Sequence, residues 1–239
     1  MDELRRSHYD KHYQKDMFSV SNKYDKLLGL LRDYSVSVFL DVGCGDGSFA
    51  SAVQRELQCK SYGIDISQDA ADSAQKNGVK AFQLDIDSED FPFESLYFDC
   101  VFCGEIIEHL YYPDHLLREV HRVLRPGGIL LLTTPNMASW FNRISILLGF
   151  QPIFSDVGLE RNFGHLWEME PMGHLRLFTY RSIMGLIDFH GFTVIATRGI
   201  GMNPLIGFGR KHAYLVRVTN RVFRGPAWNS GILILARKK

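Results

Sequence analysis

Apolar residues along this chain follow two alternating spacings, one typical of buried strands and one typical of helices. Short runs rich in β-branched and aromatic residues recur between segments in which apolar residues return every three or four positions. The strands predicted from these runs are residues 36–43, 61–66, 80–86, 98–104, 129–136, 192–201 and 229–239. The helices predicted between them are residues 48–57, 68–78, 114–124 and 180–191. Strands that alternate with helices indicate an α/β fold, a parallel sheet with helices on both faces.

Three features depart from this alternation. Residues 1–35 carry apolar side chains at helical spacing, so we expect an N-terminal helical segment ahead of the first strand. Residues 125–128, Arg-Pro-Gly-Gly, should form a turn that ends the preceding helix. No convincing crossover helix leads into residues 229–239, so the last strand is expected to be antiparallel. The length of the chain favours one domain over residues 1–239.

An insertion follows the fifth predicted strand. Residues 137–172 are rich in aromatic residues and methionine and show no strand-helix alternation. Such a segment at the carboxyl end of a strand is typical of a lid or an acceptor-binding segment. A helical subdomain that packs on the core is the alternative.

Charge and composition limit the partners. The chain has 27 basic and 27 acidic residues, so no global field draws it to nucleic acid, and we expect no DNA partner. It shows no export signal and no apolar run long enough to span a bilayer, which predicts a soluble, cytoplasmic protein. The four cysteines are then expected to be free thiols. For Cys100 and Cys103, on opposite faces of a strand, core packing is favoured over a redox or zinc role.

A glycine-rich turn joins the first strand to the first helix. Gly43, Gly45 and Gly47 let the backbone approach a ligand closely at the edge of the sheet where α/β proteins bind nucleotides. Asp65 ends the second predicted strand 20 residues after Gly45, where it can accept hydrogen bonds from ribose hydroxyls. Asp85 ends the third and could accept from an adenine amino group.

Two carboxylates crowd this turn. Asp41 precedes the glycines and Asp46 lies among them, and both would repel a pyrophosphate. A ligand with positive charge is favoured, and S-adenosylmethionine, with its sulfonium and ammonium groups, fits.

These motifs together carry a family resemblance. The segments LDVGCGDGSF, GIDIS, LDID, FDCVFCGEIIEHL and VLRPGGILLLTTPN resemble, in order and spacing, the motifs of class I S-adenosylmethionine-dependent methyltransferases. The segment GHLRLFTYRSIMGLIDFHGF is similar to the branch that includes ubiquinone-biosynthesis O-methyltransferases and small-molecule methyltransferases. The resemblance implies a Rossmann-like sheet of seven strands, mostly parallel, with the last antiparallel. It also implies that the loop from Asp41 to Gly47 contacts the methionine part, Asp65 the ribose, and Asp85 with Ile86 the adenine. Candidate cofactor-binding residues are Asp41, Gly43, Cys44, Gly45, Gly47, Asp65, Ile66, Asp85, Ile86 and Gly104.

The segment after the fourth strand carries the candidate catalytic groups. Glu105, Glu108 and His109 should lie on one side of a helical turn, where they could bind Mg²⁺ or another divalent ion that activates an acceptor hydroxyl. The pattern resembles the metal-binding motif of small-RNA 2′-O-methyltransferases and of some ubiquinone-pathway enzymes, whose further histidine matches His174, with His165 a second choice. Catalytic candidates are therefore Glu108, His109 and His174, and metal candidates are these three with Glu105. Two alternatives stay open: a histidine that acts as a base without metal, and a purely structural role.

The function predicted from these patterns is O-methylation of a small-molecule or lipid-linked acceptor. An RNA 2′-O-methyltransferase is the rival enzyme, although the zero net charge weakens it. A nucleotide-sensing protein without activity and a nicotinamide-dependent oxidoreductase are further alternatives. Five basic residues between Gly209 and Gly225 could contact an anionic acceptor or a membrane surface, or form a solvated edge. The sequence does not indicate the oligomeric state.

Overall fold

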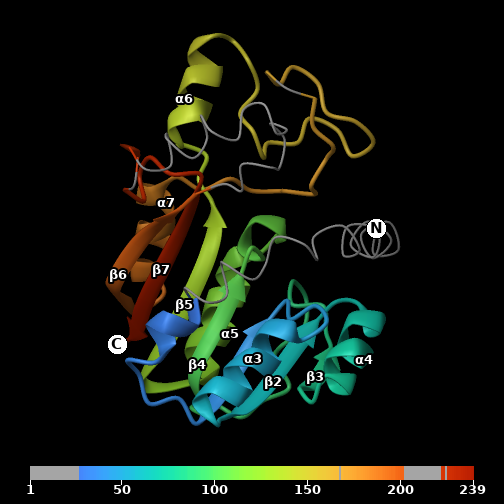
Figure 1. Ribbon diagram of the computed structural model, residues 1–239, viewed down its shortest axis with the longest axis vertical. Helices are drawn as coiled ribbons and strands as arrows, with labels where there is room; N and C mark the ends of the chain where they lie inside the picture. The colour runs from blue at the N-terminus through green and yellow to red at the C-terminus, as the bar shows by residue number, and fades with distance from the viewer. Residues whose placement is uncertain (1–26, 167, 202–221, 224) are drawn as a thin grey trace. The chain divides into compact units, whose positions relative to one another are not determined.

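The computed structural model describes residues 27–166, 168–201, 222–223 and 225–239 (Figure 1). Of the predicted N-terminal segment, residues 27–31 are helical, and residues 1–26 lie outside the described residues. Most of the basic stretch between Gly209 and Gly225 also lies outside them.

Strands and helices follow the predicted alternation closely. The strands are β1 (Val38–Val42), β2 (Lys60–Asp65), β3 (Lys80–Gln83), β4 (Phe98–Gly104), β5 (Leu124–Pro135), β6 (Phe192–Ile200) and β7 (Gly231–Lys238). The helices are α3 (Ser48–Leu57), α4 (Gln68–Lys76), α5 (Pro113–Val123), α6 (Trp140–Leu147) and α7 (Tyr180–Phe189), with a 3-10 turn η2 (Ile107–His109).

The seven strands form one sheet in the order β3-β2-β1-β4-β5-β7-β6. β1 pairs in parallel with β2 and β4, and β2 pairs in parallel with β3. β7 is the antiparallel strand, so the prediction of a mostly parallel, Rossmann-like sheet with an antiparallel last strand is confirmed.

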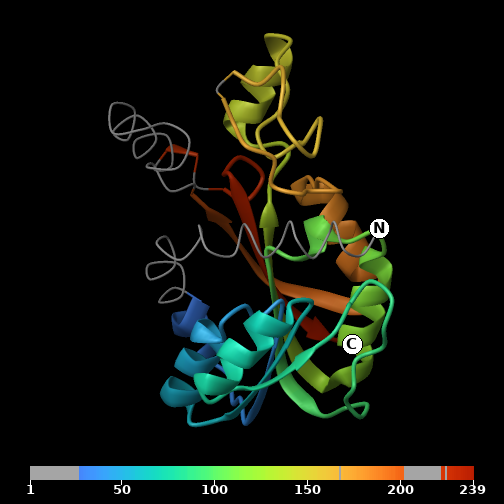
Figure 2. The ribbon, with the colours of Figure 1, turned by 90° about the vertical axis from the view of Figure 1, so that its right-hand side faces the viewer.

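The chain divides into two compact units. The first comprises the described residues up to Gly104 together with Asp114–Leu131 and Arg237–Lys239. In it, α3 and α4 lie on one side of the strands and α5 on the other (Figure 2). Its core is built from fully buried side chains such as Phe39, Phe49 and Phe98, and the first two of these rings meet edge to face. This core fixes the ends of β1 and β2, and with them the glycine-rich turn.

The second unit comprises Glu105–Pro113 and Leu132–Ala236. It holds α6, α7, β6 and most of β7, and the buried Ile183 and Ile187 form the apolar face of α7. Thr179 and Ser182 cap the start of α7 reciprocally, which satisfies backbone groups that the first helical turn would leave without partners. The boundary between the units falls within β5, and the single-domain prediction stays a prediction.

Two predicted boundaries were wrong. Residues 125–128 do not form a separate turn, because β5 begins at Leu124 and includes them; Gly127 adopts φ 74° within the strand range. The third strand ends at Gln83, so Asp85 lies beyond it, in a turn where its carbonyl accepts hydrogen bonds from the backbone of Ser88 and Glu89. A glycine with positive φ and a carbonyl-capped turn are both local features that hydrophobic spacing does not report.

Two further observations concern membrane-spanning helices and the cysteines. None of the helices in the described ranges is long and apolar enough to cross a membrane. All four cysteines are buried free thiols. Burial raises the pKa of each thiol, most strongly for Cys44, Cys100 and Cys103.

Candidate functional site

The glycine-rich turn follows β1 directly. Gly43, Gly45 and Gly47 all have positive φ, at 75°, 53° and 73°, a conformation that residues with a Cβ rarely adopt. A Cβ on Gly47 would lie 2.8 Å from the Cβ of Ala74, so this glycine also permits α3 and α4 to pack. The three glycines are therefore required by the turn itself as well as by any ligand that it binds.

Asp65 at the end of β2 ties the turn to the sheet. Its Oδ2 accepts a hydrogen bond from the Gly45 amide at 2.9 Å, and its Oδ1 accepts one from the Ser67 amide at 3.0 Å. Both carboxylate oxygens of Asp65 are acceptors, the kind of group that a ribose hydroxyl needs. Ile66 follows in the chain and is half-buried.

Negative charge gathers beneath the turn. Asp41 is 3% exposed, and burial raises the pKa of its carboxyl well above the usual range; the charges of Asp65 and Asp46 raise it further. An ionised Asp41 is thus costly in the folded chain without a cation beside it. A cation bound beside Asp41 would favour its ionised form.

The other cofactor candidates lie in the same unit. Asp85 is half-buried, its Oδ1 accepts from the Asp87 amide at 3.1 Å, and Ile86 is buried. The buried Cys44 packs so closely against β2 that a Cβ on Gly63 would lie 2.6 Å from its sulfur. Gly104 ends β4, where a Cβ would lie 2.4 Å from the ring of Phe102.

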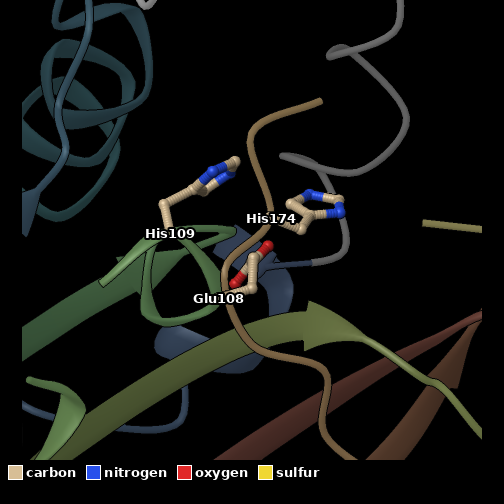
Figure 3. Close-up of side chains that lie close together, drawn as sticks. All are labelled: Glu108, His109 and His174. Atoms are coloured by element: carbon tan, nitrogen blue, oxygen red, sulfur yellow. The ribbon is translucent and has the colours of Figure 1, made fainter. Parts of the chain in front are cut away.

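In the second unit, three candidate groups lie together. Glu108, His109 and His174 each offer one possible ligand atom, and these three atoms lie within 4.8 Å of one another. Figure 3 shows the three side chains close together. Glu108 and His109 come from η2, just after β4, and His174 comes from the segment that leads into α7. The two imidazole centroids are 4.7 Å apart. Glu108 is fully buried, and its Oε2 accepts a hydrogen bond from the hydroxyl of Thr134 at 3.1 Å.

The hydrogen bonds of the two histidines define their tautomers. Nδ1 of His109 lies 3.1 Å from the carbonyl oxygen of Gly173, and Nδ1 of His174 lies 2.9 Å from that of Phe154. Because a carbonyl oxygen only accepts, each Nδ1 must carry the proton, and the lone pair of each ring is on Nε2. This is the tautomer of an imidazole that binds a metal or accepts a proton through Nε2.

Both imidazoles favour the neutral form. The pKa of His109 is lowered to about 4, mainly by burial and then by the neighbouring His174. The Gly173 carbonyl and the carboxylates of Glu105 and Asp156 act in the opposite direction. Burial likewise lowers the pKa of His174. At neutral pH the rings are therefore able to donate lone pairs.

Backbone contacts hold His174 against the segment that carries Glu108. The carbonyl oxygen of Glu108 accepts from the amides of Leu175 and Arg176, both at 2.9 Å. The guanidinium of Arg176 in turn donates to the carbonyls of Leu110 and Tyr111, at 3.3 and 2.6 Å.

Glu105 and His165 lie differently from the other candidates. Glu105 precedes η2 with φ 54°, so the expected helical turn with three groups on one side does not form; a left-handed residue cannot begin that turn. Within the described part of the chain, neither residue belongs to the group formed by Glu108, His109 and His174. Nε2 of His165 lies 3.0 Å from the Ser155 carbonyl oxygen instead.

Asp156 and Thr134 were missed by the sequence analysis. Asp156 accepts hydrogen bonds from three consecutive amides ending at His174, and Thr134 donates to Glu108. No spacing signal marks either residue, since both contacts join positions far apart in the chain. The insertion of residues 137–172, which includes Asp156, contains α6 and a bridge between Gln151 and His165.

Comparison with known proteins identifies the class. Residues 40–132 match the family described as "Methyltransferase domain". The chain is 30% identical to the ubiquinone biosynthesis O-methyltransferase of Paracidovorax citrulli over 175 residues, which cover 70% of this chain and 67% of that protein. It is 28% identical to the protein of the same name from Idiomarina loihiensis over 196 residues, 76% of this chain and 73% of that one.

The fold is similar to that of solved methyltransferases. A crystal structure of an S-adenosylmethionine-dependent methyltransferase from Thermotoga maritima covers 98% of this chain and 100% of its own, with a TM-score of 0.66 and 17% identity. The chain belongs to the class I S-adenosylmethionine-dependent methyltransferases. It is an enzyme of that class with S-adenosylmethionine as its methyl donor, in agreement with the leading prediction and not with the nicotinamide or sensing alternatives.

Proposed function

We propose that this enzyme methylates a hydroxyl oxygen of a small-molecule acceptor, with a divalent ion bound by Glu108, His109 and His174. The observation that carries the proposal is the meeting of one carboxylate and two neutral imidazoles within 4.8 Å. The names of the two relatives, both O-methyltransferases of ubiquinone biosynthesis, support an oxygen acceptor.

The donor set fits a divalent ion. Ligands about 2.1 Å from a common ion lie roughly 3 to 4 Å apart, so only small side-chain movements would complete the site. A carboxylate with two imidazoles suits Zn²⁺, Mn²⁺ or Fe²⁺ at least as well as Mg²⁺, which prefers oxygen ligands. When bound, such an ion would supply positive charge that lowers the pKa of an acceptor hydroxyl. Whichever ion binds, Thr134 orients Glu108, and the carbonyls of Gly173 and Phe154 orient the two imidazoles.

We assign the cofactor to the first unit. The loop from Asp41 to Gly47, with Cys44, would hold the methionine part, and the buried Asp41 would neutralise its positive charge. Asp65 and Ile66 would contact the ribose, Asp85 and Ile86 the adenine, and Gly104 at the end of β4 would lie beside the cofactor. In the reaction, the methyl carbon forms a bond to the acceptor oxygen as its bond to sulfur breaks. The bonding pair stays on sulfur, which gives S-adenosylhomocysteine, and the hydroxyl proton must leave.

The alternative without metal uses the same histidines. Nε2 of His109 or His174 would then take the hydroxyl proton directly, because both rings are neutral with the lone pair on that nitrogen. An RNA acceptor remains the rival for substrate class.

A lipid-linked acceptor is the finer proposal. Several apolar side chains of the 137–172 insertion are exposed, among them Leu147, Leu159 and Phe163 at 84%, 70% and 62%. An apolar acceptor would cover part of this surface, and the insertion would act as an acceptor-binding segment. Peripheral membrane contact through the basic stretch stays a prediction.

The test uses S-adenosylmethionine with a labelled methyl group, incubated with the enzyme and cell extract, with and without chelator. Label in the small-molecule or lipid fraction supports the proposal, and label in RNA supports the rival. Loss of label on chelation that Mn²⁺ or Zn²⁺ restores supports the ion. Full turnover after chelation, with Glu108→Gln no worse than the matched surface change Glu168→Gln, would reject the ion and leave the histidine base.

A further inference from the structure

The carboxylate of Asp156 gathers three consecutive backbone amides. Its Oδ2 accepts from Met172 at 3.0 Å, from Gly173 at 2.7 Å and from His174 at 3.0 Å. Its Oδ1 accepts from the side-chain amide of Asn162 at 2.9 Å. Gly173 has φ 78°, and successive amides around a left-handed residue form a concave site that suits an anion. Here a side chain of the same chain occupies that site.

This contact reaches both imidazoles. His174 is the third residue of the amide group, and its Nδ1 donates to the carbonyl of Phe154, two residues before Asp156. The carbonyl of Gly173, the middle residue, accepts from Nδ1 of His109. One carboxylate therefore fixes the turn that supplies one imidazole and the carbonyl that orients the other.

The local backbone indicates that this arrangement is held in place by its contacts. Phe154 is a non-glycine residue with φ 73°, a conformation that persists only where surrounding contacts enforce it. The hydrogen bonds of Asp156 and the bond from His174 to the Phe154 carbonyl are such contacts.

We propose that Asp156 is a positioning residue, which holds His109 and His174 in the Nδ1-protonated tautomer with Nε2 presented beside Glu108. The inference rests on the proposed function of these three groups. If so, the 137–172 insertion does more than cover an acceptor, because its Asp156 orients the two histidines that lie beside Glu108.

The first experiment reads the tautomers without metal, cofactor or turnover. Two-bond proton-nitrogen NMR spectra of the full chain are recorded for the wild type, Asp156→Asn and Glu168→Gln, with resonances assigned through His109→Gln and His174→Gln. Glu168 is an exposed carboxylate of the same insertion, so its variant makes the same charge change. We expect one Nδ1-protonated tautomer for both rings in the wild type and the control, and mixed tautomers for both in Asp156→Asn. Unchanged tautomers in Asp156→Asn would overturn the proposal.

The second experiment measures the consequence at the site. Co²⁺ is titrated into the same proteins and its visible absorption followed, with S-adenosylmethionine affinity as a check that Asp156→Asn is folded. We expect Asp156→Asn to weaken Co²⁺ binding by about tenfold or more and the control to bind as the wild type does. Equal Co²⁺ affinity in all three proteins would also overturn the proposal. If the wild type binds no Co²⁺, the ion in the proposed function fails, and the tautomer spectra alone decide the role of Asp156.

Discussion

At the scale of single residues, burial decides what His109 can do. Its pKa of about 4 means that the folded chain takes up the proton only in strongly acidic solution, whereas an unfolded histidine takes it up near pH 6.5. Between these values the unfolded state binds more protons than the folded state, so stability falls as the pH falls.

This gives a prediction for His109→Gln. From pH 7 to pH 4 the wild type should lose up to about 3 kcal/mol of unfolding free energy through this residue. The variant should lose less over the same range, since glutamine does not titrate. Urea unfolding at pH 7 and pH 4 measures the difference, with His190→Gln as a control that removes a histidine at the end of α7. Parallel losses in His109→Gln and the wild type would contradict the assignment.

Burial disfavours the ionised form of Asp41 as it does that of His109, and for a carboxyl this raises the pKa. Asp41→Asn should leave the ligand-free enzyme as stable as the wild type or more stable, because it removes a buried charge that Asp65 and Asp46 repel. It should weaken S-adenosylmethionine binding by about tenfold, or 1.4 kcal/mol, because the cationic ligand loses its buried partner.

Calorimetry of cofactor binding and thermal unfolding check both parts of this prediction. Asp90→Asn serves as the control because it makes the same charge change at a side chain that is 84% exposed. Equal cofactor affinity in Asp41→Asn and the wild type would show that Asp41 has no role in binding.

Residue-scale contacts were also the hardest part to predict. The sequence indicated Glu108, His109 and His174 through a motif, but Asp156 meets the His174 amide across 18 positions of a segment without periodicity. The helical turn expected to carry Glu105 does not form for a local reason, because Glu105 has positive φ.

At the scale of elements, prediction was accurate where hydrophobic spacing is strong. Helix α3 has the predicted bounds, and β1, β2 and β4 lie within a residue or two of theirs, because buried strands and amphipathic helices impose their periods on the sequence. Boundaries set by single glycines or capped turns, as at Gly127 and Asp85, were missed. α6, inside the insertion, was not predicted, and a helical subdomain was given only as the alternative to a lid. The reason is that the exposed and buried faces of α6 do not separate apolar from polar residues.

The packing of α3 on α4 yields an element-scale prediction for Gly47→Ala. The new Cβ would lie 2.8 Å and 2.9 Å from the Cβ and Cα of Ala74, at a residue with φ 73°. We expect a loss of about 1–3 kcal/mol in stability, from steric overlap and backbone strain together. Thermal or urea unfolding measures the loss.

A matched change in another helix separates this effect from a general one. Gly185 lies inside α7 with no atom within 4 Å of a built Cβ, so Gly185→Ala should stabilise the chain by about 0.5–1 kcal/mol. A loss of stability in Gly47→Ala with a gain in Gly185→Ala would confirm that the effect depends on the space around each glycine and on its φ. A Gly47→Ala enzyme as stable as the wild type would contradict the packing argument.

At the scale of the whole molecule, the residues proposed for the two ligands belong to different units. Those for the cofactor lie in the first unit, up to Gly104, and those for the ion lie in the second. Each unit should therefore bind its own ligand through its own contacts. Glu108→Gln removes the carboxylate charge from the second unit and leaves the glycine-rich turn unaltered.

For Glu108→Gln we expect the affinity for S-adenosylmethionine to stay within about twofold of the wild-type value. This corresponds to a change in binding free energy well under the roughly 1.4 kcal/mol of a tenfold effect. Methyl transfer should fall by about 100-fold or more, because the acceptor proton is no longer removed efficiently. Calorimetry with S-adenosylmethionine and the labelled-methyl assay measure the two quantities on one preparation, with Glu168→Gln as the isosteric control. Loss of cofactor affinity and turnover together would instead mean that Glu108 maintains the fold, because its buried carboxylate accepts from Thr134 in the wild type. Intact turnover would exclude Glu108 from both the metal and the base mechanisms and leave the histidines alone as catalytic groups.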